Sequence, residues 1–302
     1  MKAYFENQTK LLLKVLDTAL FHDDYALKGG TAINFFYSDM PRLSVDIDLA
    51  YTKITARDEF IEENEMFHQK LSKLLQDKFG LFTQIQRTSE KAAKQITVSS
   101  NDSTIKIETN LVFRGTVYPT ELRNSCKKIE SNYEVLHTVK TLSFEDLYAG
   151  KFCAALDRQH PRDLFDVLIF FKNHEFTDKI KVAFLIYLIS GNRPISELIE
   201  PNRIDQKRAY NNEFQGMVDT QVTYRALEEA RENLIETINQ SLDEKDRKFL
   251  VSFKEGAPNW DHINLSHVAR MPAIKWKLYN IQQMAPQKRK QALEKLKKKL
   301  GV

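Results

Sequence analysis

The order of apolar and polar positions predicts helices and strands in alternation along the first part of the chain. Residues 8–21 repeat their apolar positions at helical spacing, which predicts an opening helix. Residues 31–39 predict a short second helix that Pro41 closes. From Leu43 the period changes to two: Leu43, Val45, Ile47 and Leu49 fall on one face, and Ser44, Asp46, Asp48 and Ala50 fall on the other. This alternation is typical of a strand with one buried side.

A long helix and three further strands are expected next. Residues 60–80 form an amphipathic helical pattern that Gly80 ends. Strand-like runs follow at residues 82–90, 94–100 and 104–113, the last two joined by the polar turn Asn-Asp-Ser. The first part of the chain is therefore expected to form a mixed sheet with flanking helices.

The remainder of the chain shows helical patterns. Ser143 and Asp146 form a capping-box pattern ahead of one helix, and Pro161 lies in the first turn of the next, so these helices are expected to pack as a hairpin. Beyond about Thr177 only helical patterns occur, at residues 178–190, 224–242 and 273–284. The prediction is an α+β protein, with a sheet-containing domain at residues 1–177 and a mainly helical C-terminal domain at residues 178–302.

Composition narrows the class of protein. Of the 302 residues, 42% are hydrophobic and 28% are charged, which suits a globular chain with a sizeable core. Cys126 and Cys153 are too few for a disulfide framework and lack metal-ligand spacing, and no apolar run is long enough to span a membrane. We therefore expect a cytoplasmic protein with no membrane partner.

Basic residues are concentrated near the C-terminus. The formal net charge is +4, and the last predicted helix has one glutamate and seven basic residues: Lys288, Arg289, Lys290, Lys295, Lys297, Lys298 and Lys299. These side chains could follow a phosphate backbone. A solvated helix face is the alternative interpretation.

Two aspartates on one strand face suggest metal chemistry. The side chains of Asp46 and Asp48 point the same way, so their oxygens can converge on divalent cations such as Mg²⁺. Upstream, Gly29 and Gly30 permit close approach of a phosphate, and Thr31 adds a hydroxyl at a helix start. A nucleoside triphosphate explains both features, because the glycine turn can hold its phosphates and the metal ions can neutralise them. A solvated strand face is the alternative.

Further charged residues extend this candidate site. Lys28 and Arg42 could contact phosphate, and Glu108, on the polar face of the strand at residues 104–113, is the candidate for a third metal-binding carboxylate. Its alternative role is an exposed strand residue paired with a lysine.

Two segments carry a resemblance to a known family. The first, "LKGGTAINFFYSDMPRLSVDIDLAY", resembles the glycine turn and D-x-D of the nucleotidyltransferase superfamily, in particular its AbiEii/AbiGii toxin branch. The second, "LYAGKFCAALDRQHPRDLFDVLIF", resembles the later signature of that branch, a helix lysine followed by an arginine and then R-D-x-[FY]-D. The resemblance covers about residues 25 to 172. Ala32 and Ile33 depart from it, since many members have a leucine there.

The resemblance implies a role for each matching residue. It implies that Gly29, Gly30 and Thr31 hold the triphosphate, and we expect Lys28, Arg42 and Ser44 to take part in binding the nucleotide. It implies two Mg²⁺ ions on Asp46 and Asp48, with Glu108 as the third ligand. Lys151 would contact the triphosphate, and Asp166 or Asp163 would orient that lysine or the acceptor. An interhelical salt bridge is the alternative for Lys151 and Asp166.

The implied activity is transfer of a nucleoside monophosphate from an NTP to an acceptor hydroxyl, with release of pyrophosphate. The resemblance also implies a toxin that acts on tRNA or other RNA, takes part in abortive infection as a phage defence, and has a cognate antitoxin, a transcriptional regulator encoded nearby. Either Asp48 or Glu108 could be the general base. Three alternatives remain: transfer to a small molecule or a protein hydroxyl, a non-catalytic nucleotide-binding regulator, and a D-x-D glycosyltransferase. The last leaves the glycine turn and R-D-x-F-D unexplained.

Overall fold

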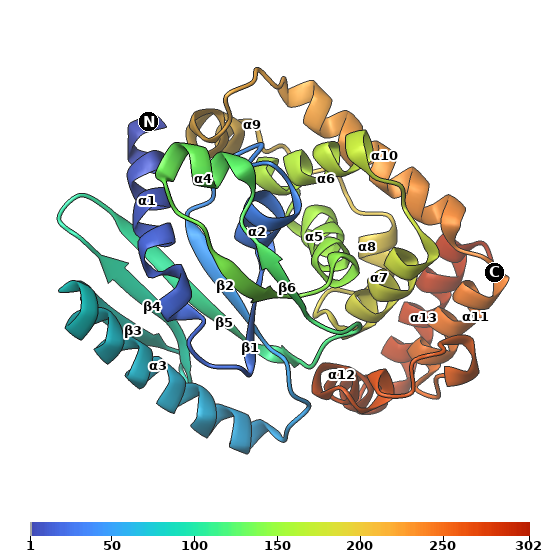
Figure 1. Ribbon diagram of the computed structural model, residues 1–302. Coiled ribbons are helices and arrows are strands. Elements are labelled where there is room, and N and C mark those ends of the chain that lie inside the picture. The colour runs from blue at the N-terminus through green and yellow to red at the C-terminus, as the bar shows by residue number, and fades with distance from the viewer. Residues whose placement is uncertain (1) are drawn as a thin grey trace. The chain divides into compact units, whose positions relative to one another are not determined.

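A seven-stranded mixed sheet organises the first part of the chain in the computed structural model, which describes residues 2–302 (Figure 1). The strand order is β3-β4-β5-β2-β1-β7-β6, and β2 is parallel to β5 as β1 is to β7, while the other neighbours are antiparallel. The strands are β1 (Tyr25–Lys28), β2 (Asp46–Tyr51), β3 (Phe82–Arg87), β4 (Ala93–Ser99), β5 (Thr104–Arg114), β6 (Glu121–Asn124) and β7 (Thr138–Thr141).

Two helices cover one face of this sheet. Helix α1 (Lys2–Ala19) packs against β2 and β5, and α3 (Arg57–Phe79) packs against β3, β4 and α1. Gly80 ends α3 with φ +64°, and its N–H donates to the carbonyl of Gln76 at 2.9 Å. The predicted helices at both places are confirmed.

The predicted strand at Leu43 begins later than its sequence pattern suggested. Strand β2 starts at Asp46, because the preceding residues bond to a distant part of the chain. The Leu43 N–H donates to the Met217 carbonyl at 2.8 Å, and Arg42 forms an isolated bridge with Val218. The alternation of side chains still holds from Asp46 onward, since Ile47 and Leu49 are fully buried.

Several short strands and one short helix were not predicted from the sequence. Strands β1, β6 and β7 and helix α4 (Lys127–Tyr133) are too short for a clear period. The predicted short helix begins at Gly29 itself, as α2 (Gly29–Ala32), and continues as the π-helical turn η1 (Ile33–Tyr37).

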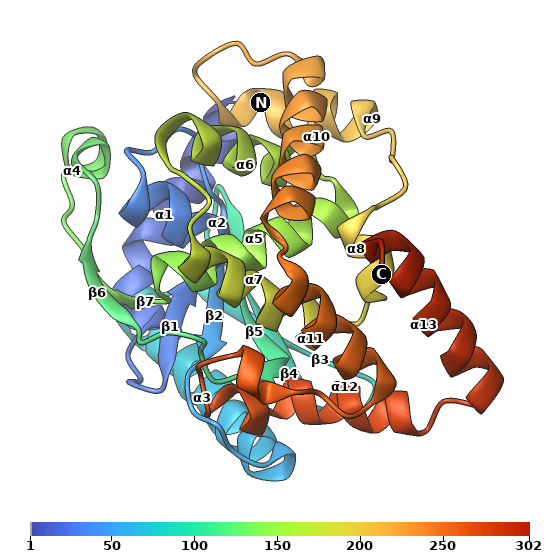
Figure 2. The same ribbon diagram turned by 90° about the vertical axis from the view of Figure 1, so that its right-hand side faces the viewer.

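Helices make up the later part of the chain (Figure 2). They are α5 (Phe144–Arg158), α6 (Pro161–Asn173), α7 (Asp178–Ser190), α8 (Ile195–Ile199), α9 (Lys207–Ala209), α10 (Tyr224–Ser241), α11 (Glu244–Glu255), α12 (Pro272–Gln282) and α13 (Pro286–Leu300), with short helical turns η2 (Tyr210–Phe214), η3 (Gln215–Met217), η4 (Trp260–His262) and η5 (Val268–Arg270). Pro161 starts α6 as predicted. Ser143 caps α5 by accepting from the Asp146 N–H at 3.1 Å, and the Asp146 carboxylate accepts from the N–H groups of Val117 and Tyr118.

The chain divides into two compact units, and the architecture is α+β, as predicted. The first unit runs up to Leu147 and includes Asn212–Gln221, while the second contains Tyr148–Asn211 and Val222–Val302. The first holds the sheet, and the second is helical. The division at Leu147 lies before residue 177, where the sequence predicted a domain boundary. The domain boundary at residue 177 stays a prediction.

Candidate active site

The face of the sheet opposite α1 and α3 carries the aspartates of β2. Ile47, Leu49 and Tyr51 are buried on the helix-covered side, where the Tyr51 ring contacts Phe60 of α3. Because side chains alternate along a strand, Asp46 and Asp48 point to the other side, and both are half-buried. The strand thus holds two carboxylates on one face.

Strand register places further charged residues in a row with Asp48. Lys28 of β1 lies opposite Asp48 on one side, and Glu108 of β5 lies beside it on the other. Asp46 is the neighbour of Lys106 in the same pair of strands. The register therefore brings together three predicted site residues that are as many as 80 positions apart in the sequence.

These carboxylates suit a cation that arrives with other ligands. Among residues 2–302, Asp48 and Glu108 form no ion pair, and no group of three or more His, Cys, Asp or Glu side chains is arranged to hold a metal ion. Mg²⁺ is commonly bound by one or two carboxylates, with water and substrate phosphates completing its shell. The donor set fits a magnesium ion bound together with a triphosphate better than a site made wholly of protein.

The glycine turn lies directly against the second aspartate. Gly29 has φ +73°, a conformation that favours glycine, and a Cβ there would collide with the Asp48 carboxylate. A Cβ on Gly30 would lie 2.6 Å from Nη2 of Arg42. The two glycines therefore leave room for a carboxylate and a guanidinium, a reason for their presence that sequence analysis did not foresee.

Hydroxyl groups fasten this turn to β2. The buried Thr31 Oγ1 donates to the Asp46 carbonyl oxygen at 2.5 Å and lies 2.8 Å from Ser44 Oγ. Thr9 of α1 donates to the Ser44 carbonyl at 3.1 Å. The side chains of Thr31 and Ser44 thus face the protein, where they fix the turn relative to Asp46.

Arg42 is also held inside the first unit. Its side chain is buried, and Nη1 donates to the Leu43 carbonyl at 2.9 Å. The guanidinium lies over Gly30, as the 2.6 Å approach to a Cβ there indicates. Its positive charge is therefore fixed next to the glycine turn.

A second charged group occupies the helical unit. Lys151 of α5 is 7% exposed, and its Nζ lies 2.9 Å from Asp163 Oδ1 and 2.8 Å from Asp166 Oδ2, both on α6. Both aspartates are buried. The structure therefore joins Lys151 to each of the carboxylates that the sequence left as alternatives.

Arg158 completes this group, which we call the lysine–aspartate cluster (Lys151, Arg158, Asp163 and Asp166). Its Nε and Nη2 atoms lie 2.5 and 3.0 Å from the two oxygens of Asp163. Burial by itself raises the pKa of the Asp163 carboxyl, but the charges and hydrogen bonds of Lys151 and Arg158 outweigh burial and hold that pKa below its ordinary value. Asp163 is therefore an ionised link between α5 and α6.

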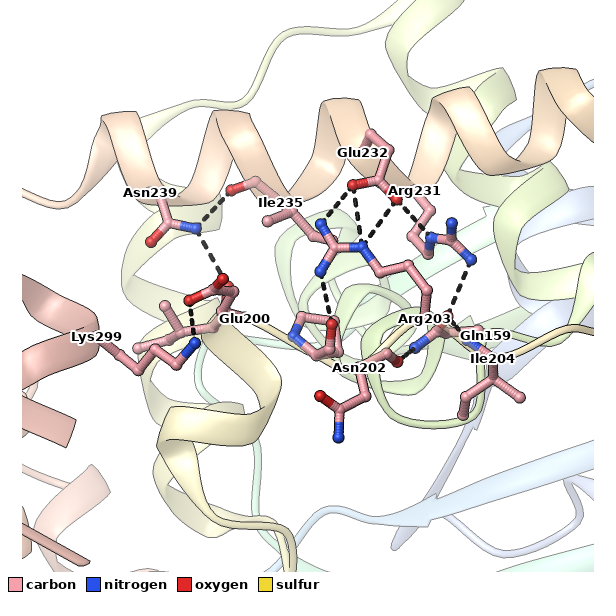
Figure 3. Close-up of polar contacts among 12 residues, drawn as sticks. Gln159, Glu200, Asn202, Arg203, Ile204, Arg231, Glu232, Ile235, Asn239 and Lys299 are labelled. Carbon is pink, nitrogen blue, oxygen red and sulfur yellow. Dashed lines mark hydrogen bonds and ion pairs between the residues drawn. The ribbon is translucent and has the colours of Figure 1, made fainter. Parts of the chain in front are cut away.

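The turn that joins these helices is anchored by Gln159, shown in Figure 3. Gln159 is buried and has φ +51°, which is uncommon for a residue with a side chain. Its Nε2 donates to the Asn202 carbonyl at 2.6 Å, and its Oε1 accepts from the Ile204 N–H and from Arg231, both at 3.0 Å. These bonds hold the turn, and with it the ends of α5 and α6.

One member of this cluster, Arg158, and its neighbour Gln159 were not predicted as site residues. Arg158 was part of the matching motif, so its helix position relative to Lys151 was a usable signal. Gln159 gave no signal, because its partners lie more than 40 positions away along the chain.

Comparison with known proteins defines the class. The fold is similar to that of MenT4, nucleotidyltransferase toxin from Mycobacterium tuberculosis H37Rv, with a TM-score of 0.61, 16% sequence identity and 92% of each chain covered. The family model "Nucleotidyl transferase AbiEii toxin, Type IV TA system" matches residues 10–278. The chain therefore belongs to the AbiEii family of nucleotidyltransferase toxins, which confirms the resemblance. No curated protein matches the sequence.

Membership of this family supports a toxin nucleotidyltransferase and implies an antitoxin partner. Within the described part of the chain, no helix has the length and apolar character needed to cross a membrane.

Proposed function

We propose that this protein transfers a nucleoside monophosphate from an NTP to a hydroxyl of tRNA or another RNA, with two Mg²⁺ ions and release of pyrophosphate. The observation that carries the proposal is the contact between the Gly29 turn and the carboxylate of Asp48, in register with Glu108. A triphosphate and its cations require these two features side by side.

Each residue of the acidic face has a defined task in this proposal. Asp46 and Asp48 hold the cations, and Glu108 adds a third carboxylate beside Asp48. When bound, Mg²⁺ supplies positive charge to the transferring phosphoryl group. Lys28, Gly29, Gly30 and Arg42 contact the phosphates, while Thr31 and Ser44 keep the turn in place. Asp48 or Glu108 accepts the proton of the attacking hydroxyl.

Lys151 supplies a further cation to the triphosphate, and Asp163 and Asp166 orient it. Replacing Lys151 by alanine should lower turnover by about 10²-fold, as for other preorganised charges. Arginine should not restore activity, because its planar fork differs from a compact ammonium held between two carboxylates. A fully active Lys151→Arg variant would indicate a structural salt bridge.

The proposed biological setting follows from the family. We propose a cytoplasmic toxin of a phage-defence system, neutralised by a cognate antitoxin that is a transcriptional regulator encoded nearby. Expression without the antitoxin should then arrest bacterial growth, and the Asp46→Ala variant should not.

Labelling tests the reaction and the acceptor together. The pure protein is incubated with Mg²⁺, total RNA and each α-labelled NTP in turn, with Asp46→Ala as the control. Label in RNA, dependent on Asp46, is the expected result. Label only in small molecules or in protein would move the activity to another acceptor. The incubation is repeated with a cell extract in place of the RNA, and failure of every NTP to label any acceptor in either mixture would contradict the proposed function.

A further inference from the structure

A small cavity in the helical unit is lined by three lysines and one glutamate among mainly apolar residues. It has a volume of about 180 Å³, and its charged lining residues are Lys254, Lys288, Lys295 and Glu197. They come from α11, α13 and α8, and α13 packs against both other helices (Figure 2). Lys288 and Lys295 lie beyond residues 10–278, so the family match gives no expectation for this cavity.

Lys254 is the unusual residue of this lining. Its side chain is only 9% exposed, yet it has no hydrogen bond or ion pair with any residue that the structure describes. Burial lowers the pKa of its amino group. Most of this side chain is withdrawn from water, and its amino group gains no ion pair or hydrogen bond from the described residues in return.

The neighbouring Lys277 shows how a half-buried lysine finds hydrogen-bond partners in this unit. Its Nζ donates to the carbonyl oxygens of Gly191, Asn192 and Arg193 at 2.5, 3.2 and 3.1 Å. Burial and, to a smaller extent, the charge of Lys254 lower its pKa to about 8. Lys277 has its partners within the protein, whereas Lys254 lines a cavity that could admit one.

Charge and size define the missing partner. Three lysines line the cavity against a single carboxylate, and Glu197 is already engaged by Lys295 at 3.2 Å and Arg193 at 3.7 Å. Lys288 is exposed at the rim and forms no ion pair with the described residues. A drug-sized ligand needs about 300 Å³ or more, so the cavity is too small for a whole nucleotide. A single tetrahedral oxyanion suits the excess positive charge of the lining and fits within this volume.

We propose that this cavity binds one phosphate group, with Lys254 as the buried ligand and Lys288 at the rim. The group could be free orthophosphate or a phosphate of a nucleic acid chain. The second source rests on the proposed function, because it would place RNA on the helical unit, whereas the first is independent of catalysis.

Phosphate titration of matched variants tests the proposal. Thermal unfolding and calorimetric binding are measured with orthophosphate at constant ionic strength, on the full chain. The wild type should show saturable binding and a rise in Tm. Lys254→Met should lose about ten-fold or more in phosphate affinity. Lys245→Met, an exposed lysine on the same helix, should behave as the wild type. General stabilisation by phosphate acts on all variants alike, so the difference between them is the signal.

The Tm without phosphate separates a ligand site from a structural role. If Lys254 serves a ligand, Lys254→Met should raise Tm, because it removes an unpaired charge from a side chain that is largely withdrawn from water. If instead Lys254 stabilises the carboxyl end of its own helix, Tm should fall, which would count against the proposal. Lys288→Gln provides a second test in case Lys254→Met does not fold. The Lys288 side chain is exposed, so this variant should fold normally, and it should also weaken phosphate binding.

A second titration identifies the source of the phosphate. Binding of a single-stranded RNA oligonucleotide is measured with and without orthophosphate. Loss of RNA affinity in Lys254→Met, with competition by phosphate, assigns the cavity to a nucleic acid phosphate. Unchanged RNA binding with lost orthophosphate binding assigns it to the free anion. The proposal is overturned if neither ligand depends on Lys254 and Lys288. Both titrations omit NTP, so their outcome is separate from that of the labelling experiment.

Discussion

Individual side chains on the acidic face of the sheet lead to the first prediction. Asp46→Ala and Asp48→Ala should each lower transfer by about 10²-fold or more, because each removes a ligand of the cation that stabilises the transferring phosphate. Tm should stay the same or rise, since two like charges on one strand face repel each other. Nucleotide transfer and thermal unfolding are measured in parallel.

The matched control is Asp102→Ala, an exposed aspartate in the turn between β4 and β5. It should leave both transfer and Tm unchanged. Wild-type activity in either Asp46→Ala or Asp48→Ala, with Mg²⁺ still required, would remove these residues from the site.

A pair of glycines gives the second prediction. Gly29 and Gly80 both have positive φ, but only at Gly29 would a Cβ meet other atoms. Gly80→Ala should therefore lower the free energy of unfolding only by the cost of placing alanine in a left-handed backbone conformation, about 1–2 kcal/mol, and should keep full activity. Gly29→Ala should cost more and should also lower transfer by about 10²-fold, because it displaces the Asp48 carboxylate.

Denaturant unfolding and the transfer assay together measure these effects. Equal losses of stability in the two alanine variants, with activity retained in both, would show that nucleotide transfer does not depend on the close approach of Gly29 and Asp48.

At the scale of elements, the α5–α6 hairpin depends on the ionised Asp163. Asp163→Asn should destabilise the protein by about 3–5 kcal/mol near neutral pH. The substitution removes the carboxylate that both Lys151 and Arg158 pair with, so their positive charges are no longer fully neutralised. Because the folded pKa of Asp163 lies below the unfolded value of about 3.9, its stabilisation is present above that pH. It is lost as pH falls through the folded pKa, so the difference between wild type and variant should shrink below about pH 4.

Urea unfolding at several pH values measures this difference. The control is Asp157→Asn on α5, whose partner Arg193 is at the surface, and it should change stability little at any pH. A difference between wild type and Asp163→Asn that is small near neutral pH, or that grows on acidification, would contradict the sign of the pKa shift.

The helices and strands differ in how well they could be predicted from the sequence. The long helices and the strands β3, β4 and β5 have repeating patterns of their own, so periodicity found them. Strand β2 was predicted three residues too early, because Leu43 continues the alternation while bonding to Met217, more than 170 positions away. Strands β1, β6 and β7 are four residues each, which is too short for a period to emerge.

The candidate site divides in the same manner. Asp46, Asp48, Gly29 and Lys151 belong to local motifs, which the sequence displays directly. The position of Glu108 beside Asp48 comes from the parallel pairing of β2 and β5, which no local pattern specifies. Long-range hydrogen bonds, such as those of Gln159, likewise follow from tertiary structure alone.

At the scale of the whole molecule, the basic C-terminal helix divides into two sets of residues. Lys295, Lys297 and Lys299 form ion pairs with Glu197, Glu255 and Glu200, and Leu296 and Leu300 are buried. Figure 3 shows the pair of Lys299 and Glu200. Among the described residues, no ion pair is formed by Lys288, Arg289, Lys290 or Lys298. Removing α13 would therefore disturb the helical unit, so charge substitutions are the cleaner test of its role.

Salt dependence distinguishes an RNA acceptor from a small neutral one. Contacts to phosphates release counterions, so the affinity for a polyanion falls with salt, with a log–log slope of about −0.7 per phosphate neutralised on a single strand. If α13 contacts RNA, replacing Lys290 and Lys298 by glutamine should reduce the magnitude of the slope by about 1.4 and weaken binding. Affinity is measured by titration of labelled RNA at several salt concentrations, without NTP.

The control for this measurement is the double substitution of Lys207 and Lys245 by glutamine. These lysines are exposed in the same helical unit and, like Lys290 and Lys298, form no ion pair with the described residues, so the net charge changes equally. A loss of slope confined to the Lys290 and Lys298 variant would locate phosphate contacts on α13. Equal slopes in the two double variants would instead leave α13 as a solvated helix face, because a purely global effect of net charge cannot distinguish one pair of lysines from the other.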